Sequence, residues 1–173
     1  MADTLLPARI HIVGRRNAGK TTLVCDLVCE LSSRGLHVAT VKHTHHHHEL
    51  DTPGKDSWKH RDAGACGVGI LSPQMMAAFV PTDRKEQVLD EYSQLSRLFG
   101  HCDLLLVEGD LHTNAKKVEV WRDSVDEPPY ACSEQHDILA VISDTEGCFS
   151  GSVWPRHDIK SIADQVLKEV LRD

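Results

Sequence analysis

The segment that most restricts the fold of this 173-residue chain runs from Arg9 to Gly35. Its first residues, RIHIVG, are apolar and β-branched and end in glycine, which predicts a buried strand running into a turn. Leu23, Leu27 and Leu31 follow at four-residue spacing and predict an amphipathic helix that ends near Gly35. Between strand and helix lies GRRNAGKT, which fits the pattern G-x-x-x-x-G-K-[ST]. A strand and a helix joined by this pattern indicate a phosphate-binding loop.

The residue types in this loop have chemical reasons. Gly14 and Gly19 let the backbone curl so that successive N–H groups point at phosphate oxygens, and the helix N-terminus adds its positive dipole end. Lys20 is expected to reach the β- and γ-phosphates, and the Thr21 hydroxyl to coordinate Mg²⁺. The alternative is a glycine-rich turn with a solvated lysine. The residues expected to contact a nucleotide here are Gly14, Asn17, Ala18, Gly19, Lys20, Thr21 and Thr22.

Two residues of the loop depart from its commonest form. Ala18 stands where many such loops carry glycine, which is acceptable if its φ angle is negative. Arg15 follows the first glycine, where one branch of P-loop proteins has a lysine that reaches the partner's nucleotide across a dimer. We expect Arg15 to be a solvent-exposed arginine, with the cross-dimer role as the alternative.

The rest of the chain alternates apolar runs with amphipathic ones. Strands are predicted at HVATVK (37–42), DLLLVEGD (103–110) and ILAVIS (138–143), with short apolar runs at 66–72 and 75–80. KVEVWR (117–122) alternates in polarity and predicts a half-exposed strand. Helices are predicted before Gly100, with a capping box at Asp83 and Glu86, and at DIKSIADQVLKEVLRD (158–173). The alternation predicts one α/β domain over residues 1–173, with a mostly parallel sheet flanked by helices.

Carboxylates stand at the ends of two of these strands, where ligands bind in such sheets. Glu108 ends the apolar run LLLVE, and a carboxylate there is costly unless it meets a cation. We therefore expect Glu108 to hold the Mg²⁺ shell, rather than to be a surface acid. Asp144 follows AVIS, in the topological place for a carboxylate that accepts the N1 and N2 hydrogens of guanine. An aspartate that only begins a turn is the alternative.

Composition excludes some classes of protein. A net charge of −7 and a pI near 5.9 argue against a general nucleic-acid or anionic-membrane binder. No stretch approaches the ~18 apolar residues of a membrane span, and the N-terminus does not resemble a signal peptide, so a cytoplasmic location is expected. The six cysteines form no C-x-x-C pair. We expect them reduced and packed in the core, although Cys25 and Cys29 are spaced to bring two thiols together on one helix face.

The segment after residue 42 has five histidines within six positions, followed by an unusual block. Lys42-His43, Asp51, PGKDS (53–57) and AGA (63–65), in this order and spacing, resemble the MobB family of molybdopterin-guanine dinucleotide biosynthesis. The phosphate loop, DLLLVEG and VISD (141–144) match other blocks of that family. The resemblance therefore covers most of the chain from Ile10 to about Asp144.

This resemblance implies a GTP-binding protein of the P-loop NTPase fold, usually a homodimer, with GTP and Mg²⁺ as cofactors. It implies an adapter that works beside the MobA guanylyltransferase, which joins GMP from GTP to molybdopterin, and a weak GTPase at most. The expectation of GTP rather than ATP rests mainly on the resemblance. Asp51 is expected to be a further Mg²⁺-shell or switch residue. Lys55, Asp56 and Ser57 are either helix-capping residues or contacts to molybdopterin or a partner.

The histidine run leaves its alternatives open. Neighbouring histidines on an extended segment point to opposite faces, so they do not all converge on one metal without a loop. We expect ordinary polar residues, with His43 nearest the phosphates, over adventitious surface metal binding and over a dedicated metal site. The alternative function is a metallochaperone-type P-loop GTPase with a histidine-rich metal-binding segment. A small-molecule kinase or ligase on the same fold is a third reading.

Overall fold

The computed structural model describes residues 7–44, 49–81, 91–133, 135–145, 147, 149 and 151–171. Internal contacts divide the chain into two compact units. The first unit combines Met1–Thr44 with Leu95–Asp173, and the second is His45–Gln94. The single domain expected over residues 1–173 stays a prediction.

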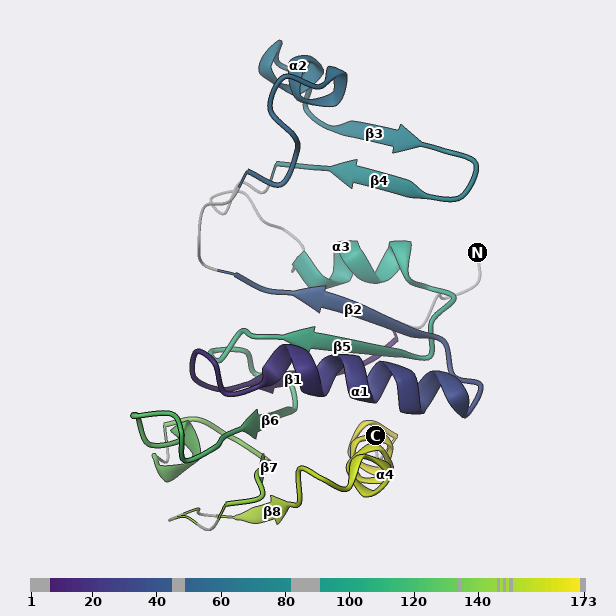
Figure 1. Cartoon of the computed structure of the whole chain (residues 1–173). Coiled ribbons are helices and arrows are strands. Elements are labelled where there is room, and N and C mark those ends of the chain that lie inside the picture. Colours follow the sequence, from purple (N-terminus) through teal and green to yellow (C-terminus); the bar gives the residue numbers. More distant parts are fainter. Residues whose placement is uncertain are drawn as a thin grey trace. The chain divides into compact units, whose positions relative to one another are not determined.

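The first unit is built on a six-stranded sheet, whose strands are labelled in Figure 1. The strand pairings show that every strand runs parallel to its neighbours. The strand order is β2-β5-β1-β6-β7-β8. The strands are β1 (Ala8–Val13), β2 (Val38–Lys42), β5 (Leu104–Glu108), β6 (Lys117–Val120), β7 (Ala140–Ile142) and β8 (Ser152–Trp154). The predicted α/β fold with a mostly parallel sheet is confirmed. Strand β8 was not predicted, because its three residues at the sheet edge carry too short a pattern.

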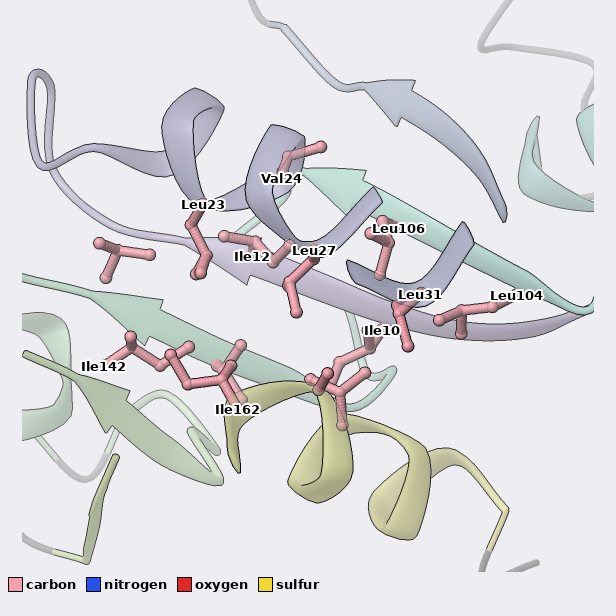
Figure 2. Close-up of a cluster of buried hydrophobic side chains, with 14 of the residues drawn as sticks. Ile10, Ile12, Leu23, Val24, Leu27, Leu31, Leu104, Leu106, Ile142 and Ile162 are labelled. Atoms are coloured by element: carbon pink, nitrogen blue, oxygen red, sulfur yellow. The ribbon is translucent and has the colours of Figure 1, made fainter. Parts of the chain in front are cut away.

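Helices α1 (Lys20–Ser33) and α4 (Ile159–Val170) form the core with one face of this sheet. Leu23, Leu27 and Leu31 of α1 are fully buried and lie over the inward side chains of β1, Ile10 and Ile12 (Figure 2). Burial of each such side chain contributes roughly 1.5–3 kcal/mol. The Asp158 side chain caps α4 by accepting the Ser161 N–H at 3.0 Å. No helix in the described part of the chain is long and apolar enough to cross a membrane.

Strand β6 corrects the half-exposed strand predicted from KVEVWR, since all four of its residues are buried. Its neighbours are β1 and β7, so both edges are paired, and both of its faces are covered. Val118 and Val120 face the core, whereas Lys117 and Glu119 lie on the other face with internal partners. Lys117 Nζ donates to the Thr113 carbonyl, and Glu119 accepts two backbone N–H groups. The alternating polarity predicted that Lys117 and Glu119 face solvent, whereas in the fold they are buried and their polar groups form internal hydrogen bonds.

The carboxyl end of β1 is the point where the strand order reverses. The chain passes from β1 through α1 to β2 on one side, and β5 is followed by β6 on the other side of β1. Ligands of open α/β sheets bind in the crevice outside such a point. The phosphate loop, residues 14–19, occupies this position between β1 and α1.

The second unit contains helix α2 (Asp56–Asp62) and an antiparallel hairpin of β3 (Val68–Leu71) and β4 (Met76–Phe79). Asp51 is buried there, and its Oδ1 accepts the Thr52 N–H at 2.8 Å and the Ser57 hydroxyl at 2.9 Å. Helix α3 (Glu91–Leu98) crosses the boundary between the units. The capping box predicted at Asp83 and Glu86 lies outside the described residues.

The cysteines correct a second prediction. Cys25, Cys29, Cys66 and Cys132 are free and exposed, and Cys102 is half-buried, so core packing was wrong for the first four. In α1 the buried stripe passes through Leu23, Leu27 and Leu31. A residue two positions further along a helix lies about 200° around it, which places both thiols of α1 on the outer side.

Candidate functional site

The backbone of the phosphate loop has the curled form that its glycines predict. Gly14 has φ +145°, and a Cβ added there would collide with the Val120 carbonyl of the neighbouring strand. Gly19, the N-cap of α1, has φ +100°. Asn17 has φ +61°, which asparagine tolerates better than most residues. Ala18 is buried and is not among the described residues with positive φ, so the condition set for it by the sequence is met.

Lys20 lies inside the curve of this loop. Its Nζ donates to the carbonyl oxygens of Gly14 at 2.9 Å and Arg15 at 2.7 Å. Burial lowers the pKa of the Lys20 ammonium, and the nearby Glu108 carboxylate works against that shift. The ammonium is thus held by neutral carbonyls, and a phosphate oxygen would be a stronger, charge-assisted partner.

Thr21 and Glu108 meet at the carboxyl ends of β1 and β5. The Thr21 hydroxyl is 3.0 Å from Oε1 and 2.9 Å from Oε2 of Glu108. Lys42 Nζ, at the end of β2, lies 3.6 Å from Glu108 Oε1. Hydroxyl and carboxylate oxygens are the donors that Mg²⁺ prefers, so this pair fits the cation predicted for it. Thr21 directly follows Lys20, so the predicted Mg²⁺ site lies next to the lysine that would bind the phosphates.

A cavity of about 440 Å³ opens over these residues. We call it the phosphate cavity, and it is lined by Arg16, Asn17, Gly19, Lys20, Thr21, Thr22, Lys42, Glu108 and Arg122. Four of these side chains are cationic and one is a carboxylate. In a chain of net charge −7, such a concentration of positive charge favours an anionic ligand.

A second cavity, of about 360 Å³, adjoins the first and holds Asp144. The two cavities share Gly19, Thr22 and Arg122. Asp144 Oδ1 accepts the backbone N–H of His157 at 3.0 Å and lies 2.7 Å from its Nδ1. Burial works to raise the pKa of Asp144, but the hydrogen bonds from His157 outweigh it, and the pKa lies below its ordinary value. We call this the base cavity, because its carboxylate is the one predicted to read guanine.

The segment between β6 and the 3-10 helix η1 (Tyr130–Cys132) packs against the phosphate loop. We call residues 121–129 the β6–η1 loop. Glu119 accepts the N–H groups of Tyr130 and Ala131, both at 2.8 Å, and this fixes the start of η1. Burial raises the pKa of Glu119, and these two N–H groups lower it in part.

Arg15 ties the phosphate loop to this segment. Its guanidinium lies 3.8 Å from the centre of the Tyr130 ring, 2.6 Å from Glu127 Oε2, and donates to the Pro128 carbonyl at 3.2 Å. The side chain is 23% exposed, so the prediction of a solvent-exposed arginine was wrong. Its partners stand more than 110 residues away in sequence, where no local pattern identifies them.

Arg122 is a site residue that the sequence did not identify. KVEVWR predicts only a strand, yet its last residue, Arg122, donates from Nε to the Ala18 carbonyl at 3.1 Å. The contact depends on β6 pairing with β1, where Val13 is in register with Glu119. No residue spacing in the sequence predicts that β6 pairs with β1.

The structure brings most predicted site residues together. All of the predicted loop residues, with Glu108 and Asp144, lie in the first unit, and every one except Gly14 lines at least one of the two cavities. Asp51 lies in the second unit, so its place in a Mg²⁺ shell stays a prediction.

The histidine segment is described in part. The His43 N–H donates to the Glu108 carbonyl at 2.9 Å, which places His43 beside the predicted metal ligand. His45–His48 lie outside the described residues. Among the residues that the structure does describe, no group of three or more His, Cys, Asp or Glu side chains is arranged to hold a metal. Lys55 is the N-cap of α2, but no side-chain hydrogen bond from the described residues caps the helix; Asp56 pairs with Lys59 at 3.2 Å and Ser57 with Asp51, so the two interpretations of this block stay predictions.

Comparison with known proteins places these features in one family. The model of the family MobB, Molybdopterin guanine dinucleotide synthesis protein B, matches residues 9–144. The molybdopterin-guanine dinucleotide biosynthesis adapter protein of Escherichia coli (strain K12) is 34% identical over 151 residues, which are 87% of this chain and 86% of that protein. A crystal structure of molybdopterin-guanine biosynthesis protein B matches with a TM-score of 0.68 at 27% identity, over 95% of this chain and 99% of that one. Bacillus subtilis MobB, at 23% identity and a TM-score of 0.69 over 96% and 99% of the two chains, supports the fold.

Proposed function

Because the chain belongs to the MobB family of molybdopterin guanine dinucleotide synthesis proteins, we propose that it is an adapter in that synthesis and binds GTP with Mg²⁺. The observation that carries the proposal is the phosphate loop, with four cationic side chains around its cavity and Asp144 in the adjoining one. The relatives' shared name supplies the pathway. The cavities supply the class of ligand, which is a polyanion with a hydrogen-bonding base.

Each part of GTP has a counterpart in these residues. Lys20 and the N–H groups of the phosphate loop would bind the β- and γ-phosphates. Thr21 and Glu108 would hold Mg²⁺, which neutralises part of the phosphate charge when bound. Asp144 would accept the N1 and N2 hydrogens of guanine, which adenine does not offer in the same arrangement. His157 makes two contacts with Asp144 Oδ1, and these hydrogen bonds lower the pKa of the carboxylate.

We propose that hydrolysis is at most a slow activity of this protein. Catalysis of phosphoryl transfer to water needs a residue that orients the water, commonly a glutamine. The described residues that line the phosphate cavity include no glutamine, and their one carboxylate is engaged by Thr21. We expect a turnover well below about 1 s⁻¹, the low end for competent enzymes.

The partners in this proposal are a MobA-type guanylyltransferase, molybdopterin and a second copy of the chain, and the location is the cytoplasm. A capture experiment from cells, assayed for the guanylyltransferase and for bound pterin, tests the first two. The metallochaperone alternative has no support from the family, whose named relatives are adapters of dinucleotide synthesis.

The nucleotide-binding proposal is tested by Lys20→Ala. The substitution removes a charge-assisted contact worth about 1.5–3 kcal/mol, so calorimetry should show GTP affinity falling at least roughly tenfold. Lys168→Ala, on the exposed side of α4, is the matched control and should bind GTP as the unchanged chain does. Equal GTP affinity in the Lys20 variant and the unchanged chain would refute the phosphate loop, and a parallel titration with ATP measures the preference for guanine.

A further inference from the structure

Arg122 approaches the phosphate loop from a different strand. It follows β6 by two residues, and its Nε–H donates to the Ala18 carbonyl at 3.1 Å. Its Nη2 lies 2.7 Å from the position that a Cβ on residue 19 would take. The guanidinium therefore rests against the Ala18–Gly19 backbone, and glycine at position 19 is needed for this approach as well as for its φ of +100°.

The charge of Arg122 is not balanced by a carboxylate. Its Nε is used by Ala18, and within the described part of the chain its two Nη groups make no ion pair or hydrogen bond. The same cavity contains Arg16, Lys20 and Lys42, whose charges repel it. Four cations around one carboxylate leave a net positive charge that an anion would neutralise. The two Nη groups of Arg122 offer such an anion four N–H donors.

Arg122 lies between the two cavities, and this position indicates which part of a bound nucleotide it would contact. A nucleotide with its terminal phosphates at Lys20 and its base at Asp144 must pass its α-phosphate and ribose along the residues that both cavities share. Those residues are Gly19, Thr22 and Arg122, and Arg122 alone among them is charged. The donor lies where the α-phosphate would lie.

We propose that Arg122 is a phosphate-binding residue that holds the α-phosphate of the nucleotide in cis, between the phosphate loop and the base cavity. The inference rests on the proposed function and deepens it. It assigns to the end of β6 a contact common to GTP, GDP and GMP. It also explains why the side chain is anchored by Nε alone, since this leaves the forked Nη face for a phosphate.

The test uses the full chain and the variants Arg122→Gln and Arg122→Lys. Affinities for GTP, GDP, GMP and guanosine would be measured with Mg²⁺ by competition against a fluorescent GDP analogue. We expect Arg122→Gln to weaken GTP, GDP and GMP by a similar factor, roughly tenfold, and to leave guanosine unchanged. Arg122→Lys retains a charge but not the fork, so it should recover part of the loss. Arg97→Gln, exposed on α3, is the matched control.

The outcomes separate this inference from the proposed function. Lys20→Ala should weaken GTP and GDP far more than GMP, because Lys20 reaches the terminal phosphates. If the unchanged chain binds GTP and Lys20→Ala weakens it, but Arg122→Gln binds all three nucleotides normally, the Arg122 inference alone fails. A loss confined to GTP would also overturn it, since that pattern belongs to a γ-phosphate contact. If Arg122→Gln does not fold, the equal loss expected for GTP, GDP and GMP in Arg122→Lys decides the matter.

Discussion

At the scale of single residues, the sheet face opposite α1 carries polar side chains that are almost completely buried. His11 on β1 and Lys117 and Glu119 on β6 have exposed fractions of 0–4%. His11 Nδ1 lies 3.3 Å from the Gly109 carbonyl, directly after the predicted metal ligand Glu108. Burial lowers the pKa of His11 and raises the pKa of Glu119, so these two groups contribute to how the stability of the protein depends on pH.

His11 should make the protein acid-sensitive. Burial lowers its pKa from 6.5 to about 4, with the Gly109 hydrogen bond opposing the shift. A folded-state pKa below the unfolded one means that the neutral form stabilises the fold. That contribution is present above pH 6.5 and is lost as pH falls toward 4. The shift from 6.5 to about 4 corresponds to about 3 kcal/mol.

Urea unfolding at several pH values between 7 and 4 measures this effect. The unchanged chain should lose more free energy of unfolding across the range than His11→Gln, whose amide has no charge to gain. His37→Gln, at an exposed histidine, is the matched control and should keep the full loss. Parallel curves for the unchanged chain and His11→Gln would show that His11 does not carry the acid sensitivity.

At the scale of elements, the site depends on two loops that hold each other. The phosphate loop contributes Arg15 and the Ala18 carbonyl, and the β6–η1 loop contributes Glu127, the Pro128 carbonyl and Arg122. Glu119 anchors the far end of the β6–η1 loop through the first N–H groups of η1. The conformation of the phosphate loop is therefore supported from β6 as well as by its own glycines.

Neighbouring arginines of the phosphate loop should separate stability from binding. Arg15→Ala removes an ion pair, a hydrogen bond and the contact with the Tyr130 ring, so the free energy of unfolding should fall by about 1 kcal/mol. Arg16 lines the phosphate cavity and has no ion pair or hydrogen bond with the rest of the described chain. Arg16→Ala should leave urea unfolding unchanged and lower GTP affinity.

The variants Arg15→Ala and Arg16→Ala also test whether Arg15 acts within its own chain or across a dimer. An arginine that reached the partner's nucleotide across a dimer would, when replaced, weaken GTP binding without changing the unfolding of the chain. We expect Arg15→Ala to lower the free energy of unfolding, because its partners lie in its own chain, and to lower GTP affinity less than Arg16→Ala does.

At the scale of the whole molecule, the second unit presents an unusual surface. Strands β3 and β4 pair only with each other among the described strands, and two-stranded sheets are marginally stable in water. Large apolar side chains are exposed on and around this hairpin, namely Ile70, Leu71, Met75, Met76 and Val80. The homodimer implied by the family resemblance would cover such a surface with a second copy.

Leu71→Lys together with Met76→Lys should convert a homodimer into a monomer. These side chains are 81% and 60% exposed, so charges there are tolerated in a monomer and are costly in an interface. Light scattering on a sizing column should report twice 19.2 kDa for the unchanged chain and 19.2 kDa for the variant. Val153→Lys, exposed on β8 of the first unit, is the control. A variant that stays dimeric would place the interface elsewhere, and loss of the dimer in the Val153 variant would point to β8.

Features that depend on a few consecutive residues were determined by the sequence alone. The glycines, lysine and threonine of the phosphate loop and the leucine stripe of α1 could be predicted, because turn geometry and helical period are local properties. Glu108 at the end of β5 could be predicted for the same reason. A carboxylate directly after four apolar residues is unusual, and this contrast lies within five consecutive residues. Family blocks such as PGKDS are also contiguous, and they led to the correct family.

The tertiary structure alone decided what each segment lies against. Glu119 and Lys117 alternate as in a half-exposed strand, and they are buried because β6 lies between β1 and β7. Arg15 and Arg122 reach partners more than 100 residues away, and Cys25 and Cys29 point outward because the leucines take the core. A parallel sheet forms through long-range pairs, such as Val13 with Glu119, whose energy depends on both strands together. Neither strand contains that pairing energy in its own sequence. The burial of Lys117 and Glu119 and the position of Arg122 beside the phosphate loop are therefore seen only in the assembled sheet.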